Sequence, residues 1–342
     1  MKVLVIGPDY FNYTGSVTWA LEEQGHQVVQ QLCGDFWGEA SYLTRKLHKW
    51  GLKGAEHDYY REWNRRLITA YQAFSPDVCL VLNGDRLFTE TLEVFLSGGS
   101  RLLLWLLDSI CRMPGNETNL RYYHGIFSFE YRDQEYLQKK YGLTCGYCPV
   151  GYDSRVYFPD DIRRDQDIAF VGVPVARRLG ILRLVADYAA RTGRSLAVYG
   201  QCWDDRYFWK KMRFVRRNGV LHHYVHNHFL LPAAVASVYR RTKVCLNIHI
   251  PEHEGVNPRT FEILATGSFQ LVDQKPLLGQ LLRLNQDLSV YHHEEELLEK
   301  LDYFLNHDAE REVVARQGLA AVSEKYSMQE CVKQLFNGGQ FP

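Results

Sequence analysis

The 342-residue sequence has no excess of charge of either sign and no long apolar run. Forty basic and forty acidic side chains give a formal net charge of zero, which argues against a general polyanion binder such as a nucleic-acid-coating protein. No stretch approaches the roughly 20 apolar residues that a membrane-spanning helix needs. The apolar run at residues 3–6 is too short for a secretory signal, and no small-residue cleavage site follows it. These absences predict a soluble, cytoplasmic protein that does not bind nucleic acid.

The eight cysteines do not indicate a structural zinc site. Several of them, such as Cys79 and Cys245, lie within apolar runs, as buried thiols do. Cys145 and Cys148 form one C-x-x-C pair, but no second pair completes a zinc site. We therefore expect structural thiols.

Two further motifs are incomplete. The first apolar strand is followed by Gly7-Pro8-Asp9-Tyr10-Phe11-Asn12 rather than G-x-G-x-x-G, so dinucleotide binding is not expected. The segment from His249 to His253 matches the H-x-x-E-H pattern of zinc proteases. Pro251 lies between the two histidines and would break the helix that must present both on one face. We therefore predict no metal site there.

The pattern of apolar segments predicts two α/β units in tandem. Continuous apolar strands alternate with helical patterns through the first half of the chain, and a second series begins at Asp167. Such alternation is typical of parallel sheets, whose ligands bind beyond the carboxyl ends of the strands. The expected strands are residues 3–6, 27–31, 78–82, 102–106, 126–129, 168–172, 196–199, 244–248 and 269–272.

The charged stretch 160–167 has the composition of a linker between the two series. A helical pattern covers the tail at about residues 310–335. We assign residues 1–155 to an N-terminal Rossmann-like domain and residues 156–325 to a C-terminal Rossmann-like domain. Residues 326–342 form a C-terminal helix and tail, which we expect to cross back to the first domain.

The most informative segment holds two acids, Glu254 and Glu262, with seven residues between them. Pro258 suits the start of a helix, so Glu262 lies about one turn inside that helix and Glu254 on the loop before it. Free N–H groups at the helix start could bind a diphosphate with help from Arg259, and carboxylates suit the vicinal hydroxyls of a sugar or ribose. From spacing alone, a helix capped by Asn257 with Glu262 on its wet face explains the segment equally well.

The same segment resembles the donor site of retaining GT-B glycosyltransferases, whose two glutamates have this spacing. Nearly the whole chain is similar to the CgeB-like (spore maturation protein) family of GT-B glycosyltransferases. The pieces that carry this resemblance are Leu82-Asn83-Gly84, Trp105-Leu106-Leu107-Asp108, Pro149 to Asp153, Ile168 to Gly172, Tyr199-Gly200 with Trp203, Val244 to His249, and Asn257-x-Arg259-x-Phe261-Glu262-x-x-Ala265-x-Gly267.

The resemblance implies the GT-B fold, with two Rossmann-like parallel-sheet domains facing a central cleft. It also implies transfer of a sugar from a nucleotide-diphospho-sugar, bound by the second domain, to an acceptor bound by the first. Glu262 would hold the nucleotide ribose, Glu254 would lie near the donor sugar, and basic residues after Gly172 would neutralise the leaving diphosphate. The expected donor-binding residues are Gly172, Arg177, Tyr199, Gly200, Asn257, Arg259, Thr260 and Glu262.

Catalysis is assigned to Glu254, Arg178 and Asp108. Asp108 is the candidate general base of an inverting enzyme, although aspartates at strand ends are more often turn formers. Solvated arginines near a helix start remain the alternative interpretation of Arg177 and Arg178. On the acceptor side, the residues that we expect at strand ends and at the first helix are Gly15, Ser16, Asn83 and Asp85.

We expect no cofactor and no metal, because backbone groups and arginine can take the diphosphate charge. The acceptor stays open as a glycan, a protein, a small molecule or a lipid-linked sugar. The stretch Arg206 to Arg217 mixes cations with aromatic residues, which could make a weak membrane contact or could equally be an exposed helix covering apolar surface. Two other functions remain: a catalytically silent GT-B nucleotide-binding or scaffold module, and another GT-B enzyme such as a sugar-nucleotide epimerase.

Overall fold

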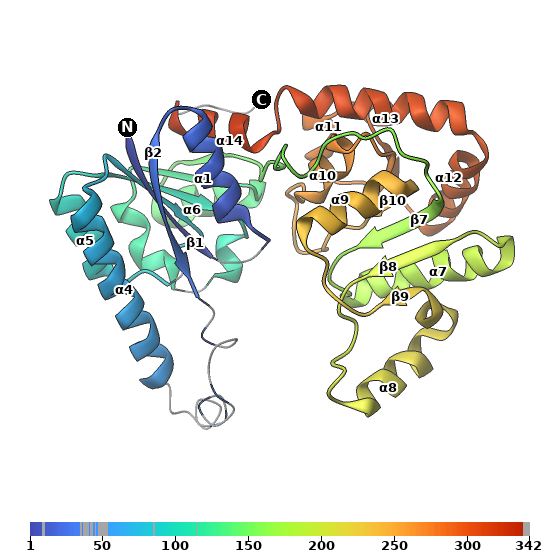
Figure 1. Ribbon diagram of the computed structural model, residues 1–342, viewed down its shortest axis with the longest axis horizontal. Coiled ribbons are helices and arrows are strands. Elements are labelled where there is room, and N and C mark those ends of the chain that lie inside the picture. The colour runs from blue at the N-terminus through green and yellow to red at the C-terminus, as the bar shows by residue number, and fades with distance from the viewer. Residues whose placement is uncertain are drawn as a thin grey trace. The chain divides into compact units, whose positions relative to one another are not determined.

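The computed structural model describes residues 1–8, 11–34, 36, 41, 44, 46, 54–84, 86–113 and 115–337. The chain forms two compact units, each built on a parallel sheet with helices on both faces (Figure 1). The first unit contains Met1–Val150 and the C-terminal helix α14 (Met328–Phe336), and the second contains Gly151–Ser327. Of the predicted site residues, Asp85 lies outside the described residues.

In the first unit, six parallel strands form a sheet with the order β2-β1-β3-β4-β5-β6. The strands are β1 (Lys2–Pro8), β2 (Gln27–Cys33), β3 (Val78–Leu82), β4 (Arg101–Leu106), β5 (Gly125–Ser128) and β6 (Cys145–Tyr147). The apolar runs become central strands because helices cover both faces, and β3 is buried along its whole length. The helices are α1 (Tyr13–Glu23), α4 (Gly54–Phe74), α5 (Thr89–Ser97) and α6 (Tyr131–Tyr141), with 3-10 turns η1 (Ile110–Arg112) and η2 (Asn116–Tyr122).

In the second unit, six parallel strands follow the order β12-β11-β10-β7-β8-β9. The strands are β7 (Gln166–Val171), β8 (Leu196–Tyr199), β9 (Val225–His226), β10 (Thr242–Asn247), β11 (Gln270–Asp273) and β12 (Ser289–Tyr291). The helices are α7 (Ala176–Thr192), α8 (Phe208–Asn218), α9 (Pro232–Arg241), α10 (Arg259–Ala265), α11 (Leu278–Leu281), α12 (Glu294–Asn306) and α13 (Asp308–Ser323), with the 3-10 turn η3 (Gly219–Tyr224). The expected class of two Rossmann-like parallel sheets is confirmed.

The strand order reverses once in each sheet, between β1 and β3 in the first unit and between β7 and β10 in the second. In open parallel sheets, ligands bind beyond the carboxyl ends of the strands at such a reversal. The topology therefore marks one candidate binding edge in each unit. Strands β6, β9 and β12 were not expected from the sequence, because runs of two or three residues show no clear period.

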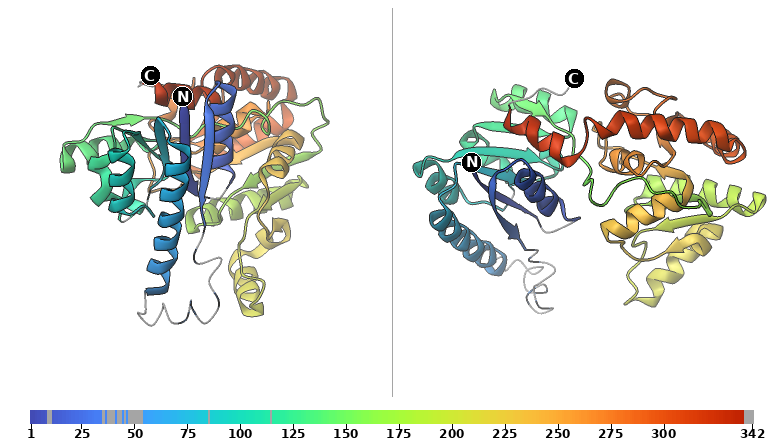
Figure 2. Two further views of the ribbon diagram at one scale, coloured as in Figure 1. Left: turned by 60° about the vertical axis from the view of Figure 1, so that its left-hand side comes forward. Right: turned by 45° about the horizontal axis from the view of Figure 1, so that its top comes forward.

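The C-terminal tail is two helices rather than one. Helix α13 belongs to the second unit, whereas α14 packs beside α1 in the first (Figure 2). Gln24 Nε2 donates to the Gln329 carbonyl at 2.9 Å, and the rings of His26 and Phe336 stack at 5.6 Å. The interruption comes at Tyr326, whose buried ring stacks on Phe261 and whose hydroxyl donates to the Leu281 carbonyl at 3.0 Å.

The charged stretch before β7 is attached to the second unit by Arg164. Its guanidinium donates to the carbonyls of Arg240 (2.9 Å), Thr242 (3.0 Å) and Gly267 (2.7 Å). All eight cysteines are free thiols, and five of them are buried. Within the described part of the chain, no helix is long and apolar enough to cross a membrane.

Candidate functional site

The candidate site of the second unit lies at the carboxyl ends of β7 and β10. The loop after β7 leads through Gly172 into α7, and a longer loop, residues 248–258, connects β10 to α10. The end of β8 approaches the same edge so closely that Gly200 must be glycine, because a Cβ there would lie 2.2 Å from the Gly172 carbonyl oxygen. Gly172 N–H in turn donates to the Tyr199 carbonyl at 2.9 Å, and the Tyr199 ring stacks on His226.

Two arginines in the first turn of α7 point to this edge. Arg178 is 2% exposed, and it donates from Nε to the Ile248 carbonyl at 2.7 Å and from Nη1 to the Val173 carbonyl at 3.0 Å. Burial and the nearby charge of Arg259 lower the pKa of Arg178 to about 9, so this side chain is still a cation at neutral pH. Arg177 donates from Nη1 to Asp273 Oδ2 at 2.8 Å and to the His249 carbonyl at 3.2 Å.

Helix α10 adds Arg259 and Glu262 to these cations. A Cβ on Gly172 would lie 3.3 Å from the Arg259 guanidinium, which therefore packs against the end of β7. Glu262 is 7% exposed, and within the described part of the chain its carboxyl group forms no hydrogen bond. Burial raises the pKa of Glu262 to about 7, although the charge of Arg259 partly opposes this shift. Its oxygens are not among the side-chain atoms of the described chain that are fully buried without a partner, so they remain accessible to an external donor of hydrogen bonds.

The start of α10 differs from the expectation of free N–H groups. Thr260 N–H donates to the Asn257 carbonyl and to Asn257 Oδ1, while the N–H groups of Phe261 and Glu262 both donate to the Pro258 carbonyl. Asn247 Nδ2 donates to Thr260 Oγ1 at 3.0 Å and to Asn257 Oδ1 at 3.1 Å. The polar groups of Asn257 and Thr260 therefore hold the loop to β10, and the cationic side chains supply the positive charge of the edge.

Three residues of this edge were not among the site residues predicted from the sequence. His249 follows β10 and is 1% exposed, Asp273 ends β11, and Lys275 follows it with 8% exposure. Asp273 Oδ1 accepts a hydrogen bond from the His249 N–H and lies 2.8 Å from His249 Nδ1, while Lys275 Nζ donates to the Ile250 carbonyl at 3.3 Å. Their positions in the sequence could have indicated them, because each residue lies at or just beyond the carboxyl end of a strand.

The electrostatics of this pair set the tautomer of His249. Burial raises the pKa of Asp273, but the hydrogen bonds from His249 and the charge of Arg177 outweigh it and hold that pKa at about 2. An ionised Asp273 only accepts, so the proton of the neutral imidazole is on Nδ1. His249 Nε2 is then an acceptor, and it is buried without a hydrogen-bond partner among the residues that the structure describes. Burial also lowers the pKa of His249 below its ordinary value, which favours this neutral form.

Glu254 lies in the 248–258 loop, half-buried, and thus follows the same strand as His249. The structure brings Gly172, Gly200, Arg177, Arg178 and Arg259 together at one edge, with Glu262 at the neighbouring helix. This group of side chains, which we call the cationic edge, consists of Arg177, Arg178, His249, Arg259, Glu262, Asp273 and Lys275.

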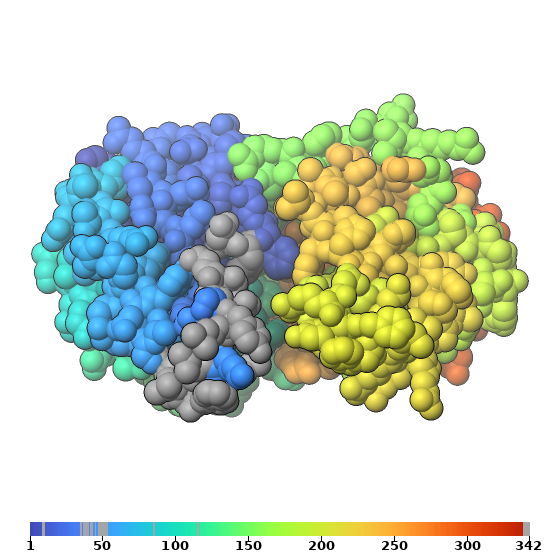
Figure 3. All heavy atoms as spheres, turned by 60° about the horizontal axis from the view of Figure 1, so that its bottom comes forward, coloured from blue at the N-terminus to red at the C-terminus, as the bar shows by residue number. Residues whose placement is uncertain are grey.

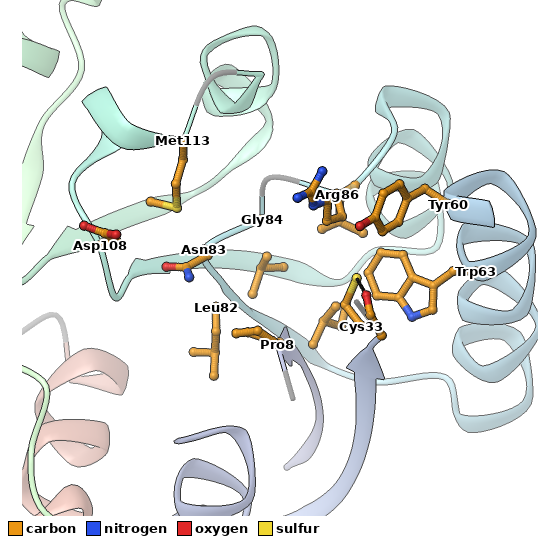
Figure 4. Close-up of a pocket in the computed structure, with 15 residues that line it drawn as sticks. Pro8, Cys33, Tyr60, Trp63, Leu82, Asn83, Gly84, Arg86, Asp108 and Met113 are labelled. Atoms are coloured by element: carbon orange, nitrogen blue, oxygen red, sulfur yellow. Dashed lines mark hydrogen bonds between the residues drawn. The ribbon is translucent and has the colours of Figure 1, made fainter. Parts of the chain in front are cut away.

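The first unit has a pocket of about 320 Å³ at its own strand reversal. Its walls come from the ends of β1, β2 and β3, from α4 and from the segment after β4 (Figure 4). The aromatic rings of Tyr60 and Trp63 lie on one side, with the Arg86 guanidinium 4.7 Å from the Tyr60 ring, and Asn83 and Asp108 lie on the other (Figure 4). Trp63 Nε1 donates to the Leu32 carbonyl at 3.0 Å, which fixes the orientation of the indole.

The predicted acceptor-side residues divide between this pocket and the adjoining helix. Asn83, with φ of 65°, accepts from Leu107 N–H through Oδ1 at 2.7 Å, and Asp108 Oδ1 accepts from Ser109 N–H at 2.8 Å. Both residues line the pocket. Gly15 and Ser16 do not line it: they lie in α1, where Ser16 Oγ donates to the Asn12 carbonyl at 3.0 Å.

Comparison with known proteins concerns the fold and the family of the second unit. Residues 177–337 match the model of a family described as glycosyl transferase-like. The chain is 22% identical to spore protein CgeB of Bacillus subtilis (strain 168) over 258 residues, which cover 71% of this chain and 77% of CgeB. Sucrose-phosphate synthase from Thermosynechococcus elongatus has a similar structure, with a TM-score of 0.68, 12% identity and 98% of both chains covered.

Two further solved structures show that this fold serves different proteins. HepE from Anabaena, solved in complex with UDP and glucose, has a TM-score of 0.66 at 11% identity, with 99% of both chains covered. A putative UDP-N-acetylglucosamine 2-epimerase from Listeria monocytogenes has a TM-score of 0.60 at 11% identity, covering 100% of this chain and 99% of that chain. The chain thus has the GT-B fold, and residues 177–337 match the glycosyl transferase-like family model.

Proposed function

We propose that this protein transfers a sugar from a nucleotide-diphospho-sugar to an acceptor hydroxyl, as a member of the CgeB-like glycosyltransferases. The nucleotide sugar binds at the cationic edge of the second unit, and the acceptor binds in the pocket of the first. The observation that carries the proposal is Glu262, a largely buried carboxyl group beside Arg259 that no residue of the described chain hydrogen-bonds.

A nucleotide ribose offers the hydrogen-bond donors that the Glu262 carboxyl group does not find within the described chain. A carboxylate is an acceptor with two oxygens, so it can bind the vicinal 2′- and 3′-hydroxyls of a ribose at once. With a pKa of about 7, Glu262 is available as a carboxylate at neutral pH, and hydroxyl donors of the ligand would stabilise that charged form. HepE was solved with UDP and glucose, which makes UDP the first nucleotide to test.

The diphosphate of the donor suits the cations of the same edge. Arg178 is held rigidly by two backbone carbonyls, and Arg177 and Arg259 lie close enough to lower its pKa through their charges. When the bond between the sugar C1 and the diphosphate oxygen breaks, negative charge grows on the departing group, and cations already in place stabilise it. We propose that these side chains allow transfer without a cofactor or a resident metal. Unchanged turnover with EDTA would support this, and dependence on added Mg²⁺ would contradict it.

For the acceptor, the pocket in the first unit offers aromatic faces and two polar groups. Tyr60 and Trp63 can stack on the apolar face of a sugar ring, while Asn83 and Asp108 can bind its hydroxyls. Asp108 is our candidate for the base that takes the proton of the attacking hydroxyl, if transfer inverts the anomeric carbon. Glu254, on the loop after β10, is our candidate for contact with the donor sugar.

The test is nucleotide binding by the wild type and two glutamate variants. Thermal shift with UDP, GDP, dTDP, ADP and CMP should identify one stabilising nucleotide, since a ligand at 100 times its Kd adds about 2.7 kcal/mol. Glu262→Ala should then weaken binding of that nucleotide by at least about 100-fold, since two charge-assisted hydrogen bonds at roughly 1.5 kcal/mol each contribute about 3 kcal/mol. Glu252→Ala changes an exposed acid of the neighbouring loop and should bind normally. If no nucleotide stabilises the protein, the proposal fails.

Product analysis separates transfer from the two other functions. Slow release of free sugar from the preferred nucleotide sugar, lost in Glu262→Ala, supports a transferase. Nucleotide binding without any turnover indicates a silent module, and a changed sugar configuration with the nucleotide still attached indicates an epimerase.

A further inference from the structure

Helix α8 of the second unit carries an exposed apolar surface that the transfer reaction does not use. Phe208, Trp209 and Met212 are 73%, 64% and 53% exposed. The opposite side of α8 already attaches the helix to its unit, because Phe214 is buried and its ring lies 4.9 Å from Trp203. The helix therefore has two apolar sides, and only one of them is needed for folding.

The exposed side follows the helical period. Phe208 and Met212 are four residues apart, so they lie one above the other, and Trp209 borders both. Figure 3 shows the α8 segment, in yellow-green, on the outer surface of the second unit. After β9, Phe229 and Leu231 add two more apolar side chains with 61% and 79% exposure. Asn227 Oδ1 accepts hydrogen bonds from the N–H groups of Cys202 and Trp203, which attach this loop to the segment before α8. Phe229 and Leu231 follow Asn227 within four residues.

Cations adjoin the apolar side of α8. The stretch 206–217 has six basic residues and no acid, in a chain whose net charge is zero. Asp204 pairs with Arg206 at 2.8 Å and with Lys210 at 3.4 Å. By contrast, Arg213, Arg216 and Arg217 are exposed, and no carboxylate of the described chain pairs with them.

The charge and the shape of this surface favour one kind of partner. A second copy of the chain would bring two cationic helices together, which is unfavourable. A nucleic acid would meet cations dispersed among stacking rings. Here Phe208, Trp209 and Met212 share one side of the helix, Arg213 and Arg217 lie beside that side, and Arg216 follows one turn after Met212. An apolar sector beside a cationic one is the pattern of helices that lie in the headgroup region of anionic bilayers.

We propose that α8 docks the protein on an anionic lipid membrane. Phe208, Trp209 and Met212 enter the boundary between headgroups and acyl chains, and Arg213, Arg216 and Arg217 bind lipid phosphates. Each basic residue near such a surface contributes about 1 kcal/mol, or roughly a fivefold change in binding. The proposal is independent of the transfer reaction, because α8 contributes no residue to the cationic edge.

Flotation with lipid vesicles tests the docking. The wild type should float with vesicles of phosphatidylcholine and phosphatidylglycerol in equal parts, should remain unbound with phosphatidylcholine alone, and should dissociate at high salt. The triple variant R213Q/R216Q/R217Q should bind the anionic vesicles at least tenfold more weakly. The variant F208S/W209S/M212S should lose flotation while melting like the wild type, because the changed side chains are exposed.

A matched control removes the same charge elsewhere. Arg183, Arg191 and Arg316 are exposed in the second unit, away from α8, so R183Q/R191Q/R316Q should float like the wild type. All variants should keep wild-type nucleotide binding, which separates this test from that of the transfer reaction. Absence of wild-type binding to anionic vesicles, equal loss in the control, or binding to RNA in place of vesicles would overturn the proposal.

Discussion

The two units share one architecture but differ in the side chains that line their binding edges. In both, a first strand leads into a helix at the strand reversal: β1 into α1, and β7 into α7. The helix of the first unit contains Gly15 and Ser16 and no basic residue, whereas the helix of the second begins with Arg177 and Arg178. The fold therefore sets where a ligand binds, and the residues at strand ends set its chemistry.

The comparison extends to burial. At the cationic edge, Arg178, His249 and Glu262 are each less than one tenth exposed. At the pocket of the first unit, the buried polar residue is Asn83, whose amide oxygen is satisfied by Leu107 N–H. Burial of charged groups lowers stability unless they are paired, so the second unit is organised for a charged ligand at a cost that the first does not have.

The largest expected effect is that of Arg178→Ala. The substitution removes the donors to the Ile248 and Val173 carbonyls, which are left without this partner at the end of β10 and after β7. We expect the free energy of unfolding to fall by about 3 kcal/mol, together with loss of nucleotide binding. Urea denaturation measures the change, and Arg183→Ala, an exposed arginine of the same helix, should stay within about 0.5 kcal/mol of the wild type. If Arg178→Ala and Arg183→Ala lowered the free energy of unfolding equally, burial of charge would not distinguish the binding edge of the second unit.

The next effect, of similar size, is expected from pH on Glu262. Because burial raises its folded pKa from 4.5 to about 7, the unfolded chain releases this proton first as pH rises. The stability that the protonated carboxyl provides is fully present below pH 4.5 and is lost as pH rises through about 7, by roughly 3 kcal/mol. Glu262→Gln cannot ionise, so its stability relative to the wild type should rise over this window. Parallel stability curves from chemical denaturation would contradict the assigned pKa.

The smallest effect should come from the pocket of the first unit. Trp63→Ala removes a ring that faces the proposed acceptor, and we expect KM for a simple glucoside acceptor to rise about tenfold, equal to about 1.4 kcal/mol. Nucleotide affinity should not change, because Trp63 is absent from the cationic edge. Trp63→Phe retains an aromatic face and should recover most of the loss. A higher Kd for the nucleotide in Trp63→Ala would contradict the assignment of the acceptor and the nucleotide to different units.

The sequence predicted most central strands correctly because their apolar runs are buried on both faces and need no partner to be recognised. It also pointed to Glu262, Arg259 and the arginines of α7, whose positions follow from local motifs. It could not show that the N–H groups at the start of α10 are occupied by Asn257 and Pro258, because those bonds depend on the exact turn. Nor could it predict the contact between His249 and Asp273, which are 24 residues apart at the ends of neighbouring strands.

By itself, the sequence determined the alternation of strands and helices, the absence of a net charge, and the residue types at each strand end, since these depend on local pattern and composition. Only the tertiary structure decided the strand orders, and with them which strand ends lie together. It also decided which ionisable groups are buried. The pKa of Glu262 near 7 and the lowered pKa of Arg178 arise from desolvation and from charges brought close by the fold, which no local pattern contains.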